Sequence, residues 1–432
     1  MELKAGYKQT EVGVIPEDWE VRALGDISDI YRGASPRPIE SPIWFDEKSQ
    51  IGWVRISDVT KSKRRLQETT QKLSELGVRH SRFVPKGSLI MSICASVGKP
   101  VVTDIDVCIH DGFVVFERQR ILQDFLYHSL KALESGWSKS GQTGSQMNLN
   151  TGIINPTKIP FPPTKAEQEA IAKALSDADA LIESLEQLIA KKRLIKQGAM
   201  QELLTGKKRL FGFQKHKGFT QCELGLIPKD WHCMQLPTLT IPSTSSIKIG
   251  PFGSALKKEY LTKDGFKVYG QENVYAKNMN TGDRFINSEH FKKLRSCEIK
   301  TGDFLISMMG TVGKCLIVPA EIKDGIMDSH LLRLRLDSEK LCPDYLAQLF
   351  ETKIIFDQVK QLSVGGIMEG LSSKIIRSLN LPVPTVNEQV AIAQILIDMD
   401  TEIDALETKL SKARAIKQGM MQELLTGKTR LI

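Results

Sequence analysis

Glycines and a lysine that could hold a phosphate group stand together in Gly310-Thr311-Val312-Gly313-Lys314. In a phosphate-binding loop, backbone N–H groups surround the phosphates, while the lysine and a following Ser or Thr reach the terminal phosphate and magnesium. That motif has four residues between its glycines, whereas two stand here, and Cys315 occupies the Ser or Thr position. The spacing therefore predicts a turn between two strands and no nucleotide site.

Carboxylates that could bind a metal ion stand at Asp344 and Glu351, close to Lys353. The residues between them favour a helix, so the two carboxylates would not converge on one ion from neighbouring strands. The segment 155–158 lacks the second proline and the aromatic residue of an adenine-methyltransferase motif. Since no catalytic set is assembled and no Cys/His cluster has zinc-ligand spacing, we expect a binding protein without catalytic residues or a metal.

The composition predicts a folded protein that does not cross a membrane. Of 432 residues, 41% are hydrophobic and 25% are charged, which is ordinary for globular domains. The 59 basic and 51 acidic residues give a formal charge of +8, which permits a nucleic-acid partner without requiring one. No apolar window is long enough for a membrane span, and the N-terminus lacks a secretory signal. With seven scattered cysteines, we expect a cytoplasmic protein with reduced thiols.

The elements that would position functional residues are organised as a duplication. Residues Glu11–Trp19 (EVGVIPEDW) return as Glu223–Trp231 (ELGLIPKDW), and Ile195–Lys207 returns as Ile416–Lys428 with one substitution. Because both offsets are about 215 residues, the chain consists of two tandem copies of one unit. The edges of the unit are nearly identical, while its middles align only through scattered glycines and apolar runs. This pattern favours a shared frame with separately specialised centres.

Each copy ends in a long predicted helix. Thr164 can cap the first helix, with Glu167 completing a capping box, and Gly206 and Gly427 are placed to end the two helices. From 166 to 204 the first helix would measure about 58 Å. Apolar residues recur at alternating steps of four and three, which is typical of a coiled-coil seam. The first seam comprises Ile171, Leu175, Ala178, Ile182, Leu185 and Ile189, and the second comprises Ile392, Leu396, Met399, Ile403, Leu406 and Leu410.

We expect the two helices to pack on each other, and the alternative is that each is buried separately against its own domain. Between the two copies, residues 207–222 contain Lys207-Lys208-Arg209 and are interpreted as a solvated basic linker, with contact to phosphate as the alternative. The repeated Trp19 and Trp231 could stack on bases, but we expect them to pack in the core or against the helices.

Short strand-like runs and helical stretches, such as 122–133 and 345–356, fill the middle of each copy. They predict an α+β (mixed α/β) fold, and the order of the strands stays open. The predicted domains are residues 1–163 and 223–384 for two globular domains, 164–206 and 385–432 for the two long helices, and 207–222 for the linker.

Four features together resemble the specificity subunit of type I restriction-modification enzymes. They are the two copies of Glu-x-Gly-x-Ile-Pro-x-Asp-Trp, the pairs Glu167-Gln168 and Glu388-Gln389 after a Pro-containing strand, the heptad helices, and the repeated Gln-Glu-Leu-Leu-Thr-Gly-Lys. Each motif is weakly specific alone, but the resemblance covers the whole chain, in order and twice.

This resemblance implies that each globular middle is a target recognition domain that reads one half of a bipartite, asymmetric site in double-stranded DNA. The two long helices would form an antiparallel coiled coil that sets the spacer and binds two modification subunits. These subunits carry S-adenosylmethionine and methylate adenine N6, and restriction subunits that use ATP and Mg join the full complex. The chain itself would bind no cofactor and catalyse nothing.

Candidate DNA-contacting residues are polar or basic positions that follow strands or lie in glycine-rich loops, since Arg and Lys suit guanine or phosphate and Gln and Asn suit adenine. They are Arg55, Asp58, Lys61, Lys63, Arg64, Arg65 and Gln142 in the first domain, and Gln271, Asn273, Lys277, Asn278, Gly365 and Gly366 in the second. The candidate coiled-coil and subunit-interface residues are Glu167, Gln168, Ile171, Leu175, Ile182, Leu185 and Ile189, with Glu388, Gln389, Ile392, Leu396, Ile403, Leu406 and Leu410.

Two other functions fit parts of the pattern. A coiled-coil adaptor that binds only protein would explain the duplicated heptads, but two large divergent centres are superfluous for that task. A nuclease acting through Asp344, Glu351 and Lys353 would require these residues to converge, which the predicted helix opposes.

Overall fold

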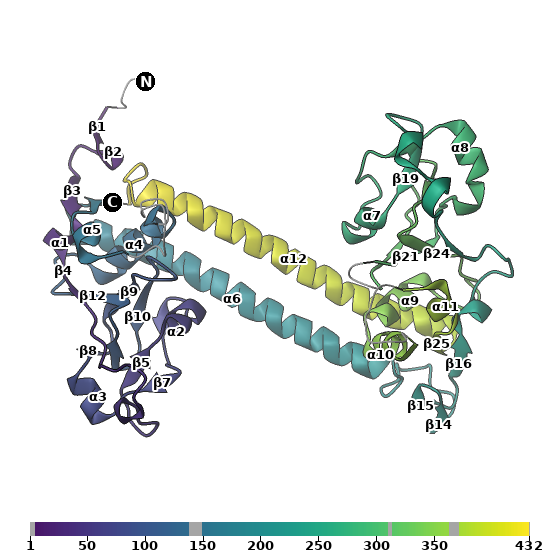
Figure 1. Ribbon diagram of the computed structural model, residues 1–432, viewed down its shortest axis with the longest axis horizontal. Helices are drawn as coiled ribbons and strands as arrows, with labels where there is room; N and C mark the ends of the chain where they lie inside the picture. Colours follow the sequence, from purple (N-terminus) through teal and green to yellow (C-terminus); the bar gives the residue numbers. More distant parts are fainter. Residues whose placement is uncertain (1–4, 138–148, 310–312, 363–370, 432) are drawn as a thin grey trace. The chain divides into compact units, whose positions relative to one another are not determined.

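The computed structural model describes residues 5–137, 149–309, 313–362 and 371–431, and the chain forms two compact units. Unit 1 comprises Met1–Glu186 with Thr408–Ile432, and unit 2 comprises Gln187–Glu407. Two 39-residue helices, α6 (Lys165–Leu203) and α12 (Val386–Leu424), each run through parts of both units (Figure 1). A long helix after each domain, as predicted from the sequence, is therefore confirmed.

Two sheets form the centre of the globular domain in unit 1. The larger has the order β4-β12-β9-β10-β6 and the smaller the order β7-β5-β11-β8. The strands of the larger sheet are β4 (Asp29–Arg32), β12 (Phe113–Glu117), β9 (Leu89–Ser92), β10 (Pro100–Thr103) and β6 (Arg65–Leu66). Those of the smaller sheet are β7 (Gln71–Lys72), β5 (Gly52–Val54), β11 (Val107–Ile109) and β8 (Arg82–Val84).

Short helices and two small antiparallel sheets complete unit 1 (Figure 1). The sheets pair β1 (Tyr7–Thr10) with β2 (Gly13–Pro16), and β3 (Glu20–Ala23) with β13 (Lys158–Phe161). The helices are α1 (Leu24–Ile27), α2 (Ile56–Lys61), α3 (Glu75–Arg79), α4 (Gln123–Trp137) and α5 (Thr151–Ile154). One core joins α4, the larger sheet and both long helices, because Phe125, Met91, Ile171 and Leu424 belong to the same buried cluster.

The domain in unit 2 repeats part of this strand order: β17-β24-β21-β22 corresponds to β4-β12-β9-β10, and β20-β19-β23 corresponds to β7-β5-β11. Its main sheets have the orders β17-β24-β21-β22 and β18-β20-β19-β23. Their strands are β17 (Ile247–Ile249), β24 (Leu331–Leu334), β21 (Phe304–Ser307), β22 (Cys315–Ile317), β18 (Leu261–Thr262), β20 (Phe285–Ile286), β19 (Phe266–Tyr269) and β23 (Gly325–Met327). Two small sheets pair β14 (Phe219–Cys222) with β15 (Gly225–Pro228), and β16 (His232–Gln235) with β25 (Asn380–Val383).

The helices of unit 2 are α7 (Gln271–Tyr275), α8 (Ser288–Lys293), α9 (Pro343–Phe350), α10 (Lys353–Leu362) and α11 (Ser373–Arg377). The prediction of a single helix over 345–356 is thus wrong, because the helical conformation is interrupted at Glu351-Thr352, between α9 and α10. The expected mixed α/β character is confirmed. In both domains an edge strand, β4 or β17, pairs antiparallel with the strand β12 or β24, while β5 and β19 each lie parallel to a later strand, β11 or β23.

Within each unit, α6 and α12 run antiparallel. In unit 1, Lys417 Nζ lies 2.5 Å from Asp179 and Arg414 lies 2.7 Å from Glu186. In unit 2, Lys192 contacts Glu402 at 2.7 Å and Lys196 contacts Asp400 at 2.7 Å. In both units, therefore, residue numbers increase along α6 as those of the contacting residues decrease along α12. The seam is buried at Ile171, Leu175, Leu185, Ile189, Ile392, Leu396 and Ile403, and half-buried at Ala178, Ile182, Met399, Leu406 and Leu410.

The helix ends also enter the domain cores, so both expected arrangements occur together. Ile171 and Leu175 share the core of unit 1 with Trp19, and Ile392 and Leu396 share the core of unit 2 with Trp231. Trp19 and Trp231 are 0% and 2% exposed, which confirms that they pack inside rather than present a face to bases.

The glycines that end the two helices adopt the left-handed conformation, with φ of 68° at Gly206 and 70° at Gly427. A Cβ at Gly206 would lie 2.3 Å from Pro228, and one at Gly427 would lie 2.6 Å from Pro16. The Thr-Gly-Lys motif that ends one copy therefore packs on the Ile-Pro-x-Asp-Trp motif that begins the other. Glycine is required here by both the backbone angle and the close approach.

Candidate nucleic-acid interface

The first predicted DNA-contacting stretch begins at α2, whose start holds Arg55 and Asp58. The Asp58 carboxylate is 7% exposed and accepts hydrogen bonds from the Arg55 backbone N–H, at 2.9 Å, and from the Thr70 hydroxyl. The Arg55 guanidinium donates to Gln71 at 2.6 Å and lies over the ring of Trp53. We therefore assign Asp58 a structural role in capping α2. Both of its carboxylate oxygens are occupied by these hydrogen bonds, so the side chain is not available to a base.

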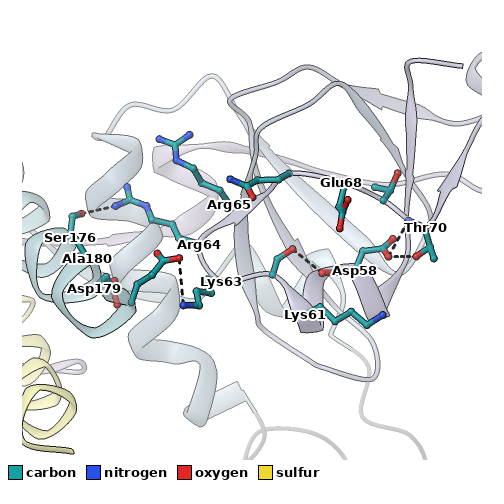
Figure 2. A pocket seen from close by; sticks show the side chains of 14 residues that line it. Asp58, Lys61, Lys63, Arg64, Arg65, Glu68, Thr70, Ser176, Asp179 and Ala180 are labelled. Atoms are coloured by element: carbon teal, nitrogen blue, oxygen red, sulfur yellow. Dashed lines mark hydrogen bonds and ion pairs between the residues drawn. The ribbon is translucent and has the colours of Figure 1, made fainter. Parts of the chain in front are cut away.

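The basic run that follows α2 is turned largely toward carboxylates of its own unit (Figure 2). Lys63 lies 2.7 Å from Glu186 and 3.4 Å from Glu183 on α6. Arg64 donates to Ser176 at 2.6 Å and pairs with Asp124. Hydrogen bonds from Lys63 and Arg414 hold the pKa of the Glu186 carboxyl below its ordinary value.

The remaining basic members of this run are Arg65 and Lys61. Arg65 lies 3.7 Å from Asp104, and Lys61 is exposed at the end of α2. The run borders an open groove of about 710 Å³ against α6, which Figure 2 shows from close by. Four basic and four acidic side chains line this groove, so their charges balance. The predicted contact of Lys61–Arg65 with DNA stays a prediction, and the charge balance gives it no support.

A buried histidine lies behind Arg64. His128 is 0% exposed, and its Nε2 lies 3.0 Å from the Ser176 hydroxyl, which also accepts the hydrogen bond from Arg64. Burial, together with the nearby Arg64 and Lys417 cations, lowers the pKa of His128 to about 3. The imidazole is therefore neutral at physiological pH and contributes packing rather than charge.

In the second domain, the predicted residues surround α7. Asn273 is fully buried: its Oδ1 accepts from the Gly270 N–H at 2.9 Å, and its Nδ2 donates to the Asn278 and Thr281 carbonyls. Asn273 thus corresponds to Asp58 and has the same structural role in capping a helix. Lys277 and Asn278 are exposed in the following turn, where Lys277 has a φ of 48°.

Gln271, at the start of α7, is half-buried, and its Oε1 is a buried acceptor with no hydrogen-bond partner in the described structure. Lys277 and Asn278 are exposed, and this amide oxygen has no partner among the described residues. The predicted contact of this second stretch with DNA stays a prediction. Gln142, Gly365 and Gly366 lie outside the described residues.

The pairs predicted at the starts of the long helices are buried within their own units. Gln168 accepts from the Leu122 N–H at 3.0 Å, and Gln389 accepts from the Cys342 N–H at 2.7 Å. Thr164 caps α6 as expected, by accepting from the Glu167 N–H at 3.2 Å. Glu167, however, directs its carboxylate to other partners, and so does Glu388.

Those partners form a clamp that occurs once in each unit. It is buried in unit 2 but partly exposed in unit 1, where the side chains of Arg430 and Asp18 are 24% and 54% exposed. In unit 2, Arg209 donates to Glu388 at 2.8 and 2.9 Å and to Asp230 at 2.5 and 3.1 Å, and the Trp231 Nε1–H donates to Glu388 at 3.2 Å. Burial alone would raise the pKa of the Asp230 carboxyl, but hydrogen bonds from Arg209 and the Lys215 N–H lower it to about 2.

Unit 1 builds the equivalent clamp from the two ends of the chain. Arg430 donates to Glu167 at 2.5 and 3.0 Å and to Asp18 at 2.9 and 3.0 Å, and the Trp19 Nε1–H donates to Glu167 at 3.2 Å.

The clamp of unit 2 corrects one prediction. The solvated linker expected over 207–222 is wrong at Arg209, whose side chain is 8% exposed. One signal was present in the sequence, because Arg209 and Arg430 both follow the repeated Thr-Gly-Lys by the same spacing.

Within the described residues, no group of three or more His, Cys, Asp or Glu side chains is placed to hold a metal ion. Across the same residues, no helix is both long and apolar enough to span a membrane.

These features define a class of protein in which one α/β domain is duplicated and each copy continues into a 39-residue helix whose ends are clamped to the domains. A family model described as "Type I restriction modification DNA specificity domain" matches residues 16–191 and again residues 245–414. The chain therefore belongs to the family of type I restriction-modification DNA specificity subunits, as its repeated motifs predicted.

Relatives along the whole chain agree with this assignment. The chain is 24% identical over 425 residues to the type I restriction enzyme MjaVIII specificity subunit of Methanocaldococcus jannaschii, covering 96% of this chain and 94% of that protein. It is 22% identical over 439 residues to the EcoBI specificity subunit of Escherichia coli, covering 95% and 85%. The crystal structure of an S subunit from M. genitalium shares the fold, with a TM-score of 0.58, 16% identity and 98% of both chains covered.

Proposed function

We propose that this chain is a non-catalytic subunit that gives a type I restriction-modification complex its sequence specificity, with each globular domain reading one half of a bipartite, asymmetric DNA site. The observation that carries the proposal is a largely shared strand order in two domains with different side chains. One chain with two unlike domains can read two unlike half-sites, whereas a homodimer with one domain type reads a palindrome.

The long helices would dock two identical modification subunits. Exposed positions that are the same in both copies, although no core of either unit includes them, are Ile195 and Ile416, Gln197 and Gln418, and Gln201 and Gln422. An identical surface presented twice suits two copies of one partner.

Two helical glycines give a physical reason to place a docking surface on this exposed face of the helices. Gly198 and Gly419 lie inside α6 and α12, where glycine costs about 1 kcal/mol relative to alanine. A Cβ at either position would have no neighbour of the chain within 4 Å, apart from adjoining residues and the helix's own backbone. The chain therefore gains nothing internally from these glycines, whereas a partner backbone that approaches closely would need them.

The helices would also set the spacer between the half-sites. Thirty-nine residues at 1.5 Å per residue give about 58 Å, longer than one turn of DNA at about 34 Å. S-adenosylmethionine would be bound by the modification subunits, and ATP and Mg by restriction subunits, so that methyl transfer and cleavage occur in the partners.

Exchanging residues 29–150 for the corresponding segment of another family member tests the proposal. The chain and its modification subunits are produced together, and methylated adenines are mapped on genomic DNA. We expect one bipartite motif for the parent and a motif with only one half-site changed for the exchanged chain. Methylation that stays unchanged would refute half-site reading, and a complex that assembles but protects no bipartite site in footprinting would indicate a protein-binding adaptor.

The docking face has a separate test based on stoichiometry. Gly198→Leu and Gly419→Leu each add a side chain to one of the two proposed docking faces. Each single variant should bind one modification subunit, and the double variant none, as measured by the mass of the complex in light scattering. Single variants that still bind two subunits would place the docking surface elsewhere.

A further inference from the structure

A row of arginines from separate parts of the sequence lies along the edge strand β4 of unit 1. Arg32 lies on β4 itself, Arg82 comes from β8, and Arg118 and Arg120 follow β12. Arg82 Nε donates to the Arg32 carbonyl at 2.7 Å, which brings the edge of the smaller sheet against β4. The fifth member, Arg37, lies in the loop after β4.

Shared partners connect these arginines into one surface. Arg37 and Arg32 both contact Asp111, through its carboxylate and its carbonyl. Tyr31 lies between Arg82, which stacks 5.1 Å from its ring centre, and Arg118, which donates to its hydroxyl at 2.7 Å.

Asp29 completes the row at its other end. Its carboxylate receives Arg118 at 2.6 Å and Arg120 at 3.2 Å. These contacts fix the direction of guanidinium groups that remain open to solvent, because the side chains of Arg37, Arg118 and Arg120 are 73%, 70% and 53% exposed.

The charge of this surface differs from that of the groove beside Lys61–Arg65. Among the described residues, the five arginines contact three carboxylates, those of Asp29, Asp111 and Glu117, which leaves a positive excess. The groove has equal numbers of basic and acidic side chains. A nucleic-acid backbone with one negative charge per about 1.7 Å of duplex is attracted to the first surface and not to the second.

The corresponding edge of unit 2 is different. There β17 pairs with β24 so that Lys248 faces Arg333 across the ladder, and the Arg333 side chain is fully buried beside Asp303. The arginine row thus belongs to one recognition domain and not to the duplicated frame. That distribution is expected for a surface that serves one half-site.

We propose that this row, named here the β4 arginine edge and formed by Arg32, Arg37, Arg82, Arg118 and Arg120, binds the phosphate backbone of DNA beside the half-site read by the first domain. The inference rests on the proposed function, since it requires that the domain bind DNA. Planar guanidinium groups held in place by a carboxylate on one side present their remaining N–H donors in a fixed geometry, which suits phosphate oxygens. Tyr31 supplies a rigid surface that spaces two of them.

The test compares two double variants of the complex with its modification subunits, on a duplex that contains the mapped site. Arg118→Gln with Arg120→Gln removes two charges from the β4 arginine edge. The matched control, Lys86→Gln with Lys158→Gln, removes two exposed charges from other parts of unit 1, each of which also has one carboxylate partner. Dissociation constants are measured between 50 and 200 mM salt.

Loss of two phosphate contacts should lower the slope of log K against log salt by about 1.8, so the affinities of parent and variant converge by about tenfold over this range. The control should keep the parent slope. Arg118→Lys with Arg120→Lys should restore most of the slope, because it returns the charge, whereas a variant that had merely lost its fold would not bind the site at any salt concentration.

The other outcomes are distinct. A slope unchanged in the glutamine variant would overturn the inference while leaving the proposed function intact. A variant that no longer assembles with the modification subunits would make the edge a protein interface, and one that only aggregates would make it a guard against strand pairing; both overturn the inference. A parent complex without sequence-specific binding would instead refute the proposed function.

Discussion

Replacing Arg209 by Met tests how much the buried clamp stabilises unit 2. Methionine keeps an aliphatic contact with Trp231, over which the guanidinium lies, but removes the cation. The side chains of Arg209, Asp230 and Glu388 are 8%, 10% and 2% exposed. Removing one partner from a buried ion pair costs about 3–5 kcal/mol, because the remaining charge is left without compensation.

Protonation limits this cost and makes it depend on pH. A carboxylate that has lost its cation can take up a proton, which for an ordinary glutamate costs about 3.7 kcal/mol at pH 7 and about 1 kcal/mol at pH 5. We therefore expect Arg209→Met to reduce the free energy of unfolding of unit 2 by about 3–4 kcal/mol at pH 7. The difference between variant and parent should shrink by up to about 2.7 kcal/mol at pH 5.

Fluorine NMR of protein labelled with 5-fluorotryptophan provides a local measurement. The sequence has five tryptophans, and Trp231 is the only one between residues 187 and 407. Its signal, assigned with a Trp231→Phe variant, reports the unfolding of unit 2 in urea, while the signal of Trp19 reports unit 1.

Arg193→Met is the matched control, because Arg193 pairs with Glu407 at the surface, where the two side chains are 63% and 42% exposed. Such a pair contributes about 0–1 kcal/mol. Equal urea midpoints for Arg209→Met and Arg193→Met, or a loss at Arg209 that is the same at pH 5 and pH 7, would refute the argument from a buried uncompensated carboxylate.

Three further predictions follow from burial and backbone geometry. Leu185→Asp places a carboxylate at a seam position that is 4% exposed, so the complex with the modification subunits should fail to assemble in light scattering, at a cost of several kcal/mol. Gly206→Ala should destabilise unit 2 by about 1–3 kcal/mol in urea unfolding because of its positive φ and the nearby Pro228, whereas Gly198→Ala should stabilise the isolated chain by about 0.5–1 kcal/mol. Because His128 is neutral when folded and charged when unfolded, stability should be lost as pH falls from 6.5 toward 3; the loss in unit 1 should be about 3 kcal/mol at pH 4.5 and absent in His128→Gln, as followed by the Trp19 signal.

The frame of the molecule was predictable because its signals are local. Alternating steps of four and three, a capping threonine and a terminal glycine each act within a few residues, and each occurs at the same place in both copies. The strand order was not predictable, since β4 pairs with β12 across more than eighty intervening residues and no short pattern encodes that partner.

The proposed DNA-contacting surface was harder to predict for a related reason. Lys61–Arg65 was predicted to contact DNA because four of its five residues are basic, but Lys63, Arg64 and Arg65 pair with carboxylates of α6, Asp124 and Asp104. The β4 arginine edge is assembled from five arginines in three separate segments, at residues 32–37, 82 and 118–120. Local sequence shows how many charges stand together, but only the fold shows how many of them remain uncompensated.

The near identity of the repeated motifs has two separable causes. Buried members, such as Gly206 and Gly427 and Trp19 and Trp231, are constrained because the end of one copy packs on the start of the other, and both junctions have the same geometry. The same holds for the two clamp arginines, of which Arg209 is buried and Arg430 half-buried. Exposed members, such as Gln201 and Gln422, have no such constraint, so their identity points outside the chain. If this division is right, substitutions at buried positions will lower the free energy of unfolding, whereas substitutions at exposed positions will weaken only assembly with modification subunits. Outside the core positions that pack on the frame, the domain middles have neither constraint, which would allow them to diverge for the proposed reading of two different half-sites.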